Sequence, residues 1–183
     1  MIDLDIRAER PEDHADVHAL VSAAFGAGSD TADFVEEVRQ KARVCLAEVA
    51  LAGGLIVGHA QWCHAPIIVD GRRVKAAYLT CLSAAPAVQR RGIGSRLVRA
   101  GLKRLFDDGF AAATLLGDPA YYGRFGFAPE LAERIEAPHR SRGRGFQAVE
   151  LVAGALDGAL VAGDFPPVIA PAGPRPETGS RNR

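Results

Sequence analysis

Hydrophobic and polar positions alternate with a period of two at the start of the chain and again in its middle. Residues 2–7 show this alternation, which is typical of a strand with one buried face. Further along, apolar segments are separated by turn signals at Gly53-Gly54 and Asp70-Gly71. The pattern predicts three antiparallel strands in a meander, at residues 44–51, 54–69 and 74–84.

A period near 3.6 predicts helices on both sides of this meander. The first is expected at residues 11–25, where Pro11, Glu12 and Asp13 suit a helix N-terminus, and the second at 31–43. A third is expected at 92–107, with an apolar stripe that we expect to be buried. The stripe consists of Ile93, Leu97, Val98, Leu102, Leu105 and Phe106.

The rest of the chain predicts short elements. We expect a strand at 111–116, a helical turn at 120–125, and strands near Phe127 and at 146–152. The order strand, glycine turn, helix, strand over residues 74–116 is a β-α-β crossover, which makes its two strands parallel. The predicted fold is therefore α/β or α+β, with a mixed, mostly antiparallel sheet and a central parallel pair.

Composition narrows the class of protein. The chain has 183 residues, 48% of them hydrophobic, and a net charge of zero, which disfavours a dedicated nucleic-acid binder. No apolar run approaches the roughly 18 residues of a membrane span, so we expect a cytoplasmic protein. Three widely spaced cysteines fit neither a disulfide framework nor a zinc site, and no metal is expected. We expect one domain over residues 1–169 and a disordered tail over 170–183, rich in Pro, Gly and polar residues.

A glycine turn at residues 89–95 carries the clearest chemical signal. Gly92 and Gly94 let the backbone approach a ligand, and the free N–H groups of the helix that follows favour a phosphate or pyrophosphate. The segment 89–104 is rich in bases and contains no acid. It is not a Walker loop, because no Gly-Lys-Ser/Thr follows, and a dinucleotide fingerprint would need a glycine at Leu97.

A second segment, residues 116–127, reads Leu-Gly-Asp-Pro-Ala-Tyr-Tyr-Gly-Arg-Phe-Gly-Phe. Taken alone, its aromatic residues would be assigned to a core or a rim. Because neighbouring parallel strands end at the same edge of a sheet, however, the loop after Leu116 and the loop after Ala84 can approach one ligand.

These two segments resemble motifs of the GNAT superfamily of N-acetyltransferases. Residues 82–95 resemble its acyl-CoA signature, in which Gln or Arg, two variable residues, Gly, one variable residue and Gly or Ala follow one another. Tyr122, shortly before Gly126-Phe127, resembles its tyrosine motif. Together they most resemble a bacterial branch of predicted N-acetyltransferases with a Gly-Asp-Pro-x-Tyr-Tyr-x-Arg-Phe-Gly-Phe stretch. The resemblance implies a GNAT-like acyl-CoA N-acyltransferase fold, with a central parallel β-α-β unit in the mixed sheet and helices on both of its faces.

The resemblance also implies roles for individual residues. The strand at residues 82–84 would splay from its neighbour, and the backbones of Leu82 and Ala84 would bind the pantetheine arm of acetyl-CoA. The backbone N–H groups of residues 90–95 would bind its pyrophosphate. Tyr122 would act as general acid or hydrogen-bond donor to the leaving thiolate. Many relatives carry an Asn near position 117 or 118; this chain does not, so Asp118 is either a turn former or a functional group. The predicted cofactor-binding residues are Leu82, Ser83, Ala84, Gln89, Arg90, Arg91, Gly92, Ile93, Gly94, Ser95, Gly117, Asp118 and Tyr121.

The acceptor side leaves several candidates open. An amine must be neutral to attack, so a base is useful for a lysine-like amine and dispensable for an α-amino group. The candidates for a base or a polar contact are Glu36, Glu37, His59, His64, Thr80, Cys81 and Ser83. The alternatives are a solvated helix face for the two glutamates and satisfied strand histidines for His59 and His64.

The leading hypothesis is transfer of an acetyl group directly from acetyl-CoA to a primary amine of a small molecule, peptide or protein. One alternative is a longer-chain acyltransferase that uses acyl-CoA or acyl carrier protein, the latter docked on the basic helix. Another is a noncatalytic acyl-CoA-binding sensor. A nicotinamide or ATP enzyme is disfavoured by the incomplete motifs. We expect a monomer or homodimer without a nucleic-acid or membrane partner.

Overall fold

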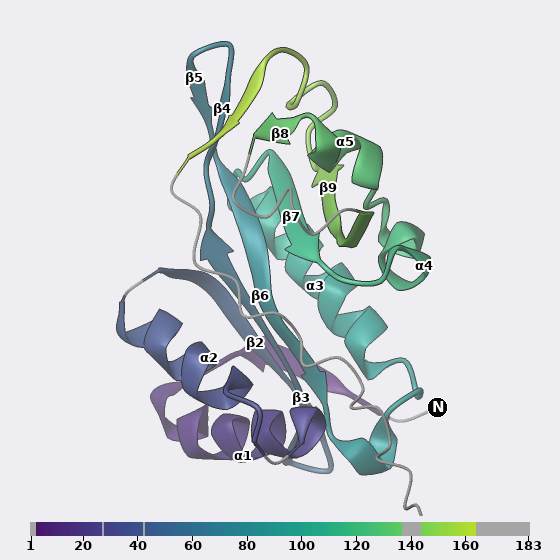
Figure 1. The fold of residues 1–183 in the computed structure, drawn as a ribbon. Coiled ribbons are helices and arrows are strands. Elements are labelled where there is room, and N and C mark those ends of the chain that lie inside the picture. The colour runs from purple at the N-terminus through teal and green to yellow at the C-terminus, as the bar shows by residue number, and fades with distance from the viewer. Residues whose placement is uncertain (1–2, 27, 42, 137–143, 164–183) are drawn as a thin grey trace, which may run out of the picture.

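The structure, a computed structural model, describes residues 3–26, 28–41, 43–136 and 144–163. Its centre is a six-stranded sheet in the order β1-β2-β3-β6-β7-β9 (Figure 1). Only β6 and β7 pair in parallel, and every other neighbouring pair in this sheet is antiparallel. The strands are β1 (Asp5–Ala8), β2 (Val44–Ala52), β3 (Leu55–His64), β6 (Ala76–Ala84), β7 (Ala112–Leu116) and β9 (Phe146–Glu150).

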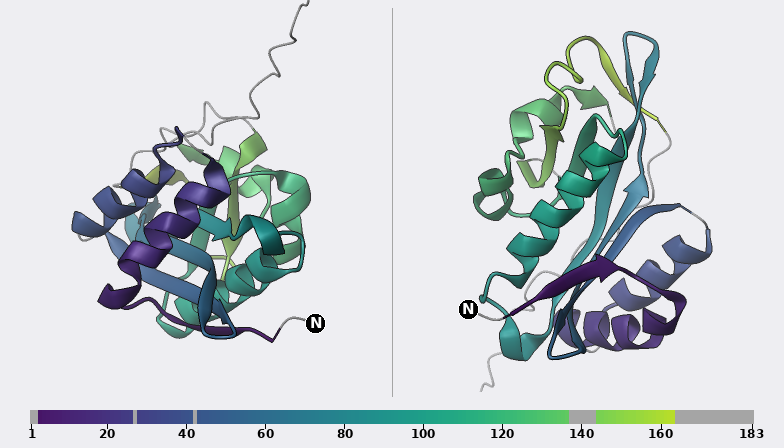
Figure 2. Two further views of the ribbon diagram at one scale, coloured as in Figure 1. Left: turned by 90° about the horizontal axis from the view of Figure 1, so that it is seen from below. Right: turned by 180° about the vertical axis from the view of Figure 1, so that it is seen from behind.

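Helices cover both faces of this sheet, as predicted (Figure 2). Helices α1 (His14–Phe25) and α2 (Thr31–Gln40) lie on one face, and α3 (Ile93–Asp107) lies on the other. Gly101 lets α3 approach the sheet, since a Cβ there would come within 2.6 Å of Trp62 Nε1. No helix in the described ranges is long and apolar enough to cross a bilayer.

A smaller sheet, ordered β5-β4-β10-β8, lies at one end of the molecule and corrects the predicted meander. Residues 54–69 do not form one strand: β3 ends at His64, and β4 (Ile67–Val69) starts after Pro66, which has no N–H to donate to a ladder. A tight turn at Asp70-Gly71 then pairs β4 with β5 (Arg72–Val74), so Val74 does not belong to β6. The remaining elements here are β8 (Ile135–Glu136), β10 (Leu160–Ala162) and helix α5 (Pro129–Glu133).

Three smaller predictions were also wrong. The helix expected at 31–43 ends at Gln40, because strand β2 begins at Val44. Phe106 is 53% exposed: it follows buried Leu105, and one residue turns a helix by about 100°, away from the sheet. The strand expected near Phe127 is a single bridge between Ala128 and Ala148. The tail expected at 170–183 lies outside the described residues.

The parallel strands β6 and β7 separate partway along their length. Their pairing runs from Ala76 with Ala112 to Leu79 with Leu115 and ends there, whereas β6 stays paired with β3 as far as Ala84. Directly after Leu79, Thr80 is an extra residue in the β3–β6 ladder, a β-bulge held by its hydroxyl, which donates to Gln61 O at 2.9 Å. Bulges increase strand twist. The β6 edge beyond Leu79 is therefore left without β7 as a partner, and this opening positions the site.

Candidate active site

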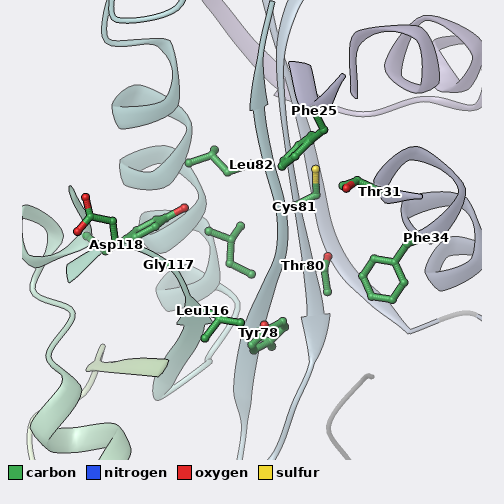
Figure 3. Close-up of a pocket in the computed structure, with 12 residues that line it drawn as sticks. Phe25, Thr31, Phe34, Tyr78, Thr80, Cys81, Leu82, Leu116, Gly117 and Asp118 are labelled. Atoms are coloured by element: carbon green, nitrogen blue, oxygen red, sulfur yellow. The ribbon is translucent and has the colours of Figure 1, made fainter. Parts of the chain in front are cut away.

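A cavity of about 310 Å³ lies at the opening between β6 and β7 (Figure 3). Phe25, Thr31 and Phe34 approach it from α1 and α2, and Leu116 and Asp118 approach it from the end of β7 on the other side of β6. Its lining residues are Phe25, Thr31, Phe34, Tyr78, Leu79, Thr80, Cys81, Leu82, Leu116, Gly117, Asp118 and Tyr122. We call it the central cavity.

A second cavity of about 320 Å³ lies over the N-terminus of α3, and we call it the helix cavity. Leu82 lines both cavities, so they adjoin at β6. The helix cavity contains most of the residues predicted to bind a cofactor. It is lined by Leu82, Ser83, Ala84, Val88, Gln89, Arg90, Gly92, Ile93, Gly94, Ser95, Tyr121 and Arg124. Among the predicted residues, Arg91 is exposed and not part of this lining, and Gly117 and Asp118 line the central cavity instead.

The local backbone explains why this turn exposes N–H groups. Gly92, the N-cap of α3, has a left-handed φ of 83°, which costs glycine little, and Arg90 also has a positive φ of 62°. The side chain of Ile93 is buried, so the helix start is anchored in the core while its first N–H groups stay free of helical partners. Such a terminus, with Arg90 beside it, favours an anion.

Tyr121 covers part of the helix cavity. A Cβ on Gly94 would lie 2.7 Å from the Tyr121 hydroxyl oxygen, so the glycine makes room for this side chain. The Arg124 guanidinium lies 4.6 Å from the centre of the Tyr121 ring, a cation–π contact. Tyr121 and Arg124 thus form part of the wall of the helix cavity.

Tyr122 lies in the central cavity within a cluster of aromatic rings. Its ring makes edge-on contacts with Tyr121, Phe125 and Phe127, at centroid distances of 4.8, 6.4 and 6.0 Å. Gly117 makes room for the ring, because a Cβ there would lie 2.2 Å from Tyr122 Cε2. Burial raises the pKa of Tyr122 above that of an ordinary phenol, so the hydroxyl stays protonated and can donate a hydrogen bond.

Asp118 acts as a turn former. It is the N-cap of the short helix α4 (Pro119–Tyr122), and its Oδ1 accepts a hydrogen bond from Ala120 N at 2.9 Å. Its side chain is exposed at the rim of the central cavity. The carboxylate therefore holds the start of the turn that carries both tyrosines.

Cys81 faces α1 and α2 from the floor of the central cavity. Burial raises the pKa of its thiol to about 12, although the neighbouring Ser83 opposes this rise. A protonated thiol is a poor nucleophile. All three cysteines, Cys45, Cys63 and Cys81, are free.

Three of the acceptor-side candidates lie elsewhere. Glu36 pairs with Arg39, Glu37 pairs with Lys41, and His64 stacks on Phe110 with a centroid distance of 5.6 Å. None of the three lines the central cavity. Thr80 and Cys81 do line it, whereas His59 and Ser83 are buried and do not, and Ser83 lines the helix cavity instead.

A buried ion pair contains a residue that the sequence did not single out. Glu9 Oε2 lies 2.9 Å from His59 Nε2, and Glu9 Oε1 accepts from Arg39 at 2.5 Å. Burial raises the pKa of Glu9, but the hydrogen bond and charge of His59 and the Arg39 guanidinium outweigh it, so the pKa falls below its usual value. Glu9 follows β1 and meets a histidine far along the chain, so only the tertiary structure reveals this pair.

Two buried atoms beside this pair have no hydrogen-bond partner among the described residues. They are His59 Nδ1 and Ser83 Oγ. His59 and Ser83 are directly opposite each other in the β3–β6 ladder. One ring nitrogen of His59 thus has a hydrogen-bond partner and the other has none in the part of the chain that the structure describes. Ser83 lies close to Cys81 at the cavity floor.

Comparisons with known proteins agree with this geometry. A model of the acetyltransferase (GNAT) domain family matches residues 5–129. The uncharacterized N-acetyltransferase YhbS of Escherichia coli K12 is 32% identical over 156 residues, which cover 84% of this chain and 90% of YhbS. The uncharacterized N-acetyltransferase YjhQ of the same strain is 31% identical over 119 residues, 64% of this chain and 65% of YjhQ.

Solved structures show the same fold. The crystal structure of E. coli YhbS in complex with CoA superimposes with a TM-score of 0.75 at 28% identity and covers 88% of this chain and 90% of YhbS. A GNAT family acetyltransferase of Brucella melitensis in complex with acetyl-CoA gives a TM-score of 0.65 at 32% identity, over 82% of this chain and 89% of that protein. The chain belongs to the GNAT family of acetyltransferases, and the predicted fold class is confirmed. It is an N-acetyltransferase.

Proposed function

We propose that this protein transfers an acetyl group from acetyl-CoA directly to a primary amine bound in the central cavity. The observation that carries the proposal is the junction of two cavities at Leu82, one at an anion-favouring helix terminus and the other beside a protonated tyrosine. The relatives solved with CoA and with acetyl-CoA support this donor.

The helix cavity fits the nucleotide end of the donor. The free N–H groups at the start of α3, with Arg90, would hold the pyrophosphate, since a helix N-terminus and a guanidinium both favour negative charge. The β6 edge over Leu82–Ala84, without β7 as a partner, would pair with the amide groups of the pantetheine arm. This arrangement directs the thioester toward the central cavity and Tyr122.

Tyr122 would stabilise the leaving thiolate. A phenol of pKa about 10 is a weaker acid than a thiol of about 8.5, and burial raises the pKa of Tyr122 further, so complete proton transfer to sulfur is uphill. A hydrogen bond from the hydroxyl to the developing charge avoids that cost. We therefore assign Tyr122 the role of hydrogen-bond donor in the transition state.

The acetyl group passes from CoA to the amine directly, without an acyl-enzyme intermediate. The neutral amine nitrogen bonds to the carbonyl carbon, the carbon–sulfur bond breaks, and CoA leaves as the thiolate. One proton passes from the nitrogen to water, and the amide keeps the other N–H. Cys81 is not an acyl carrier, because its protonated thiol is a poor nucleophile.

The test combines thiol release with mass spectrometry of the acetylated amine, for the wild type and Tyr122→Phe. We expect Tyr122→Phe to lower the single-turnover rate by about tenfold to a hundredfold with acetyl-CoA affinity almost unchanged. Tyr121→Phe is the neighbouring control, and its effect should fall on affinity, because its hydroxyl lies over the helix cavity. An unchanged rate in Tyr122→Phe would remove Tyr122 from the mechanism.

The same assay separates the alternatives. A noncatalytic sensor would bind acetyl-CoA without releasing thiol for any amine, and Tyr122→Phe would then change nothing. Docking of acyl carrier protein on the basic face of α3 would make turnover fall steeply with ionic strength. Direct use of acetyl-CoA predicts a weak dependence on salt.

A further inference from the structure

The chemistry of the central cavity wall carries an inference about the acceptor, which rests on the proposed function. Four aromatic rings line the cavity, together with leucines and the Cys81 thiol. The aromatic residues are Phe25, Phe34, Tyr78 and Tyr122. Among the described lining residues only Asp118 carries a charge, and it lies at the exposed rim. The interior of this cavity therefore offers an ammonium group no counter-ion.

The threonine hydroxyls of the wall already have partners within the protein. Thr31 Oγ1 lies 2.6 Å from Ser29 Oγ, and Thr80 Oγ1 donates to Gln61 O at 2.9 Å. Asp118 is likewise engaged, since it caps helix α4. The backbone groups of the β6 edge that lack β7 as a partner pair with the pantetheine arm in the proposed function. A ligand with many hydroxyl or ammonium groups would therefore lose its hydration in this cavity and gain few hydrogen bonds in return.

The pKa values of two side chains in the wall indicate that this environment disfavours charge. Burial raises the pKa of the Cys81 thiol to about 12 and also raises the pKa of the Tyr122 hydroxyl, so both are held in their neutral forms. The same loss of hydration lowers the pKa of an amine. Binding in this wall of mostly uncharged residues therefore favours the neutral amine that attack on the thioester requires, without a carboxylate base at the cavity floor.

We propose that the central cavity selects a primary amine carried on an uncharged, apolar body, aliphatic or aromatic, and rejects polycationic and sugar-like amines. The apolar body packs against Phe25 and Phe34 on the α1 and α2 side, and the nitrogen points to the junction with the helix cavity at Leu82. The acceptor enters as the neutral amine after it has given its proton to water.

The experiment compares two amines with the same carbon chain, n-hexylamine and 1,6-diaminohexane, at saturating acetyl-CoA and one fixed pH. They differ only in the second amino group, which stays charged. We expect kcat/KM from thiol release to be at least about tenfold higher for n-hexylamine, because the diamine must bury a second charge without a partner. Equal or better use of the diamine would overturn the proposal.

A charge placed in the wall should reverse this preference. Phe25, half-buried at the end of α1, is changed to Asp, with Phe25→Leu as the apolar control. We expect Phe25→Asp to shift the ratio of kcat/KM values at least about tenfold toward the diamine and Phe25→Leu to keep the wild-type preference. Thr31→Asp, at the first position of α2 where an acid suits a helix, makes the same test if Phe25→Asp fails to fold. A ratio that neither acid changes would overturn the proposal.

A binding measurement separates this proposal from the proposed function. If acetyl-CoA raises the melting temperature but neither amine is acetylated, the products N-hexylacetamide and N-(6-aminohexyl)acetamide are added to the CoA complex. Further stabilisation by the first product alone supports the apolar acceptor, and no stabilisation by it overturns that acceptor. Faster thiol release from hexanoyl-CoA than from acetyl-CoA would assign the cavity to the acyl chain instead. Failure of acetyl-CoA itself to bind would refute the proposed function.

Discussion

Gly117 is the residue at which one methyl group should disable the site. In the structure its Cα faces the edge of the Tyr122 ring, and a Cβ there would lie 2.2 Å from Cε2 and 2.7 Å from Cδ2. Carbon atoms in contact are separated by about 3.5–4.0 Å, so Gly117→Ala must push the ring edge back by about 1.3 Å or more. The φ of Gly117 is not in the left-handed region, so alanine itself meets no backbone strain.

Such a displacement should appear in the rate of transfer. A shift of about 1 Å in a catalytic group can cost about a hundredfold in rate. The closest clash is at Cε2, which is bonded to the carbon that carries the Tyr122 hydroxyl. We expect single-turnover thiol release to fall by about thirtyfold to a hundredfold in Gly117→Ala. Acetyl-CoA affinity should change only a few-fold, because the helix cavity is intact.

Gly123→Ala is the matched control, since a Cβ at Gly123 meets nothing within 4 Å. It lies directly after Tyr122, and its backbone is already helical, so alanine fits without strain. We expect its turnover to stay within about twofold of the wild type. If Gly117→Ala turns over as fast as Gly123→Ala, the role of Tyr122 as hydrogen-bond donor to the leaving thiolate is refuted.

Three further changes test other parts of the structure. Gly94→Ala should weaken acetyl-CoA binding about tenfold, measured by calorimetry, since its Cβ would lie 2.7 Å from the Tyr121 hydroxyl oxygen; unchanged affinity would contradict the placement of the donor. Cys81→Ser should keep turnover within several-fold in a thiol-release assay, because the thiol is not an acyl carrier; complete loss would restore that role. Hydrogen bonds from Arg7 lower the pKa of Asp13 to about 2. The ionised Asp13 carboxylate therefore adds at most about 2 kcal/mol to the free energy of unfolding above about pH 4, and this contribution is lost as the pH falls toward 2. The melting temperature of Asp13→Asn should therefore depend less on pH over this range than that of the wild type.

The glycine turn and α3 could be predicted because their signals are local. The turn at 89–95 and the periodic stripe after it are read within some fifteen residues, and the structure places the helix at Ile93–Asp107. Phe106 failed because an apolar residue next to a buried one extends a stripe in sequence although it faces away in the helix. The predicted apolar stripe therefore had the correct helical period but wrongly included Phe106.

The opening between β6 and β7 was expected only from the resemblance and not from residue patterns, because it depends on contacts between distant strands. The bulge at Thr80 is held by Gln61 on β3, and nothing near residue 80 marks an extra residue. The break that sends β4 and β5 into a second sheet was visible only as Pro66 within an apolar run. The sequence therefore singled out the two segments that line the cavities, and residue patterns did not predict the shape of the space between them.

The buried pair of Glu9 and His59 shows the same limit for polar residues. His59 was a candidate on residue type alone, but its partner lies outside any motif and meets it through the pairing of β1, β2 and β3. Glu36 and Glu37 were candidates for the opposite reason, as acids on a helix near the expected site, and both pair on their own helix. The sequence shows which charged residues are present, but only the fold shows which of them form pairs.

Thermal unfolding with saturating acetyl-CoA tests the central claim most directly. At a ligand concentration a hundredfold above Kd the expected stabilisation is about 2.7 kcal/mol, which corresponds to about 5–11 °C for a domain of this size. We expect this shift with acetyl-CoA and with CoA, a smaller one in Gly94→Ala, and none of comparable size with NADH or ATP. No shift with acetyl-CoA, or a larger shift with NADH or ATP, would contradict the assignment of the helix cavity to the donor.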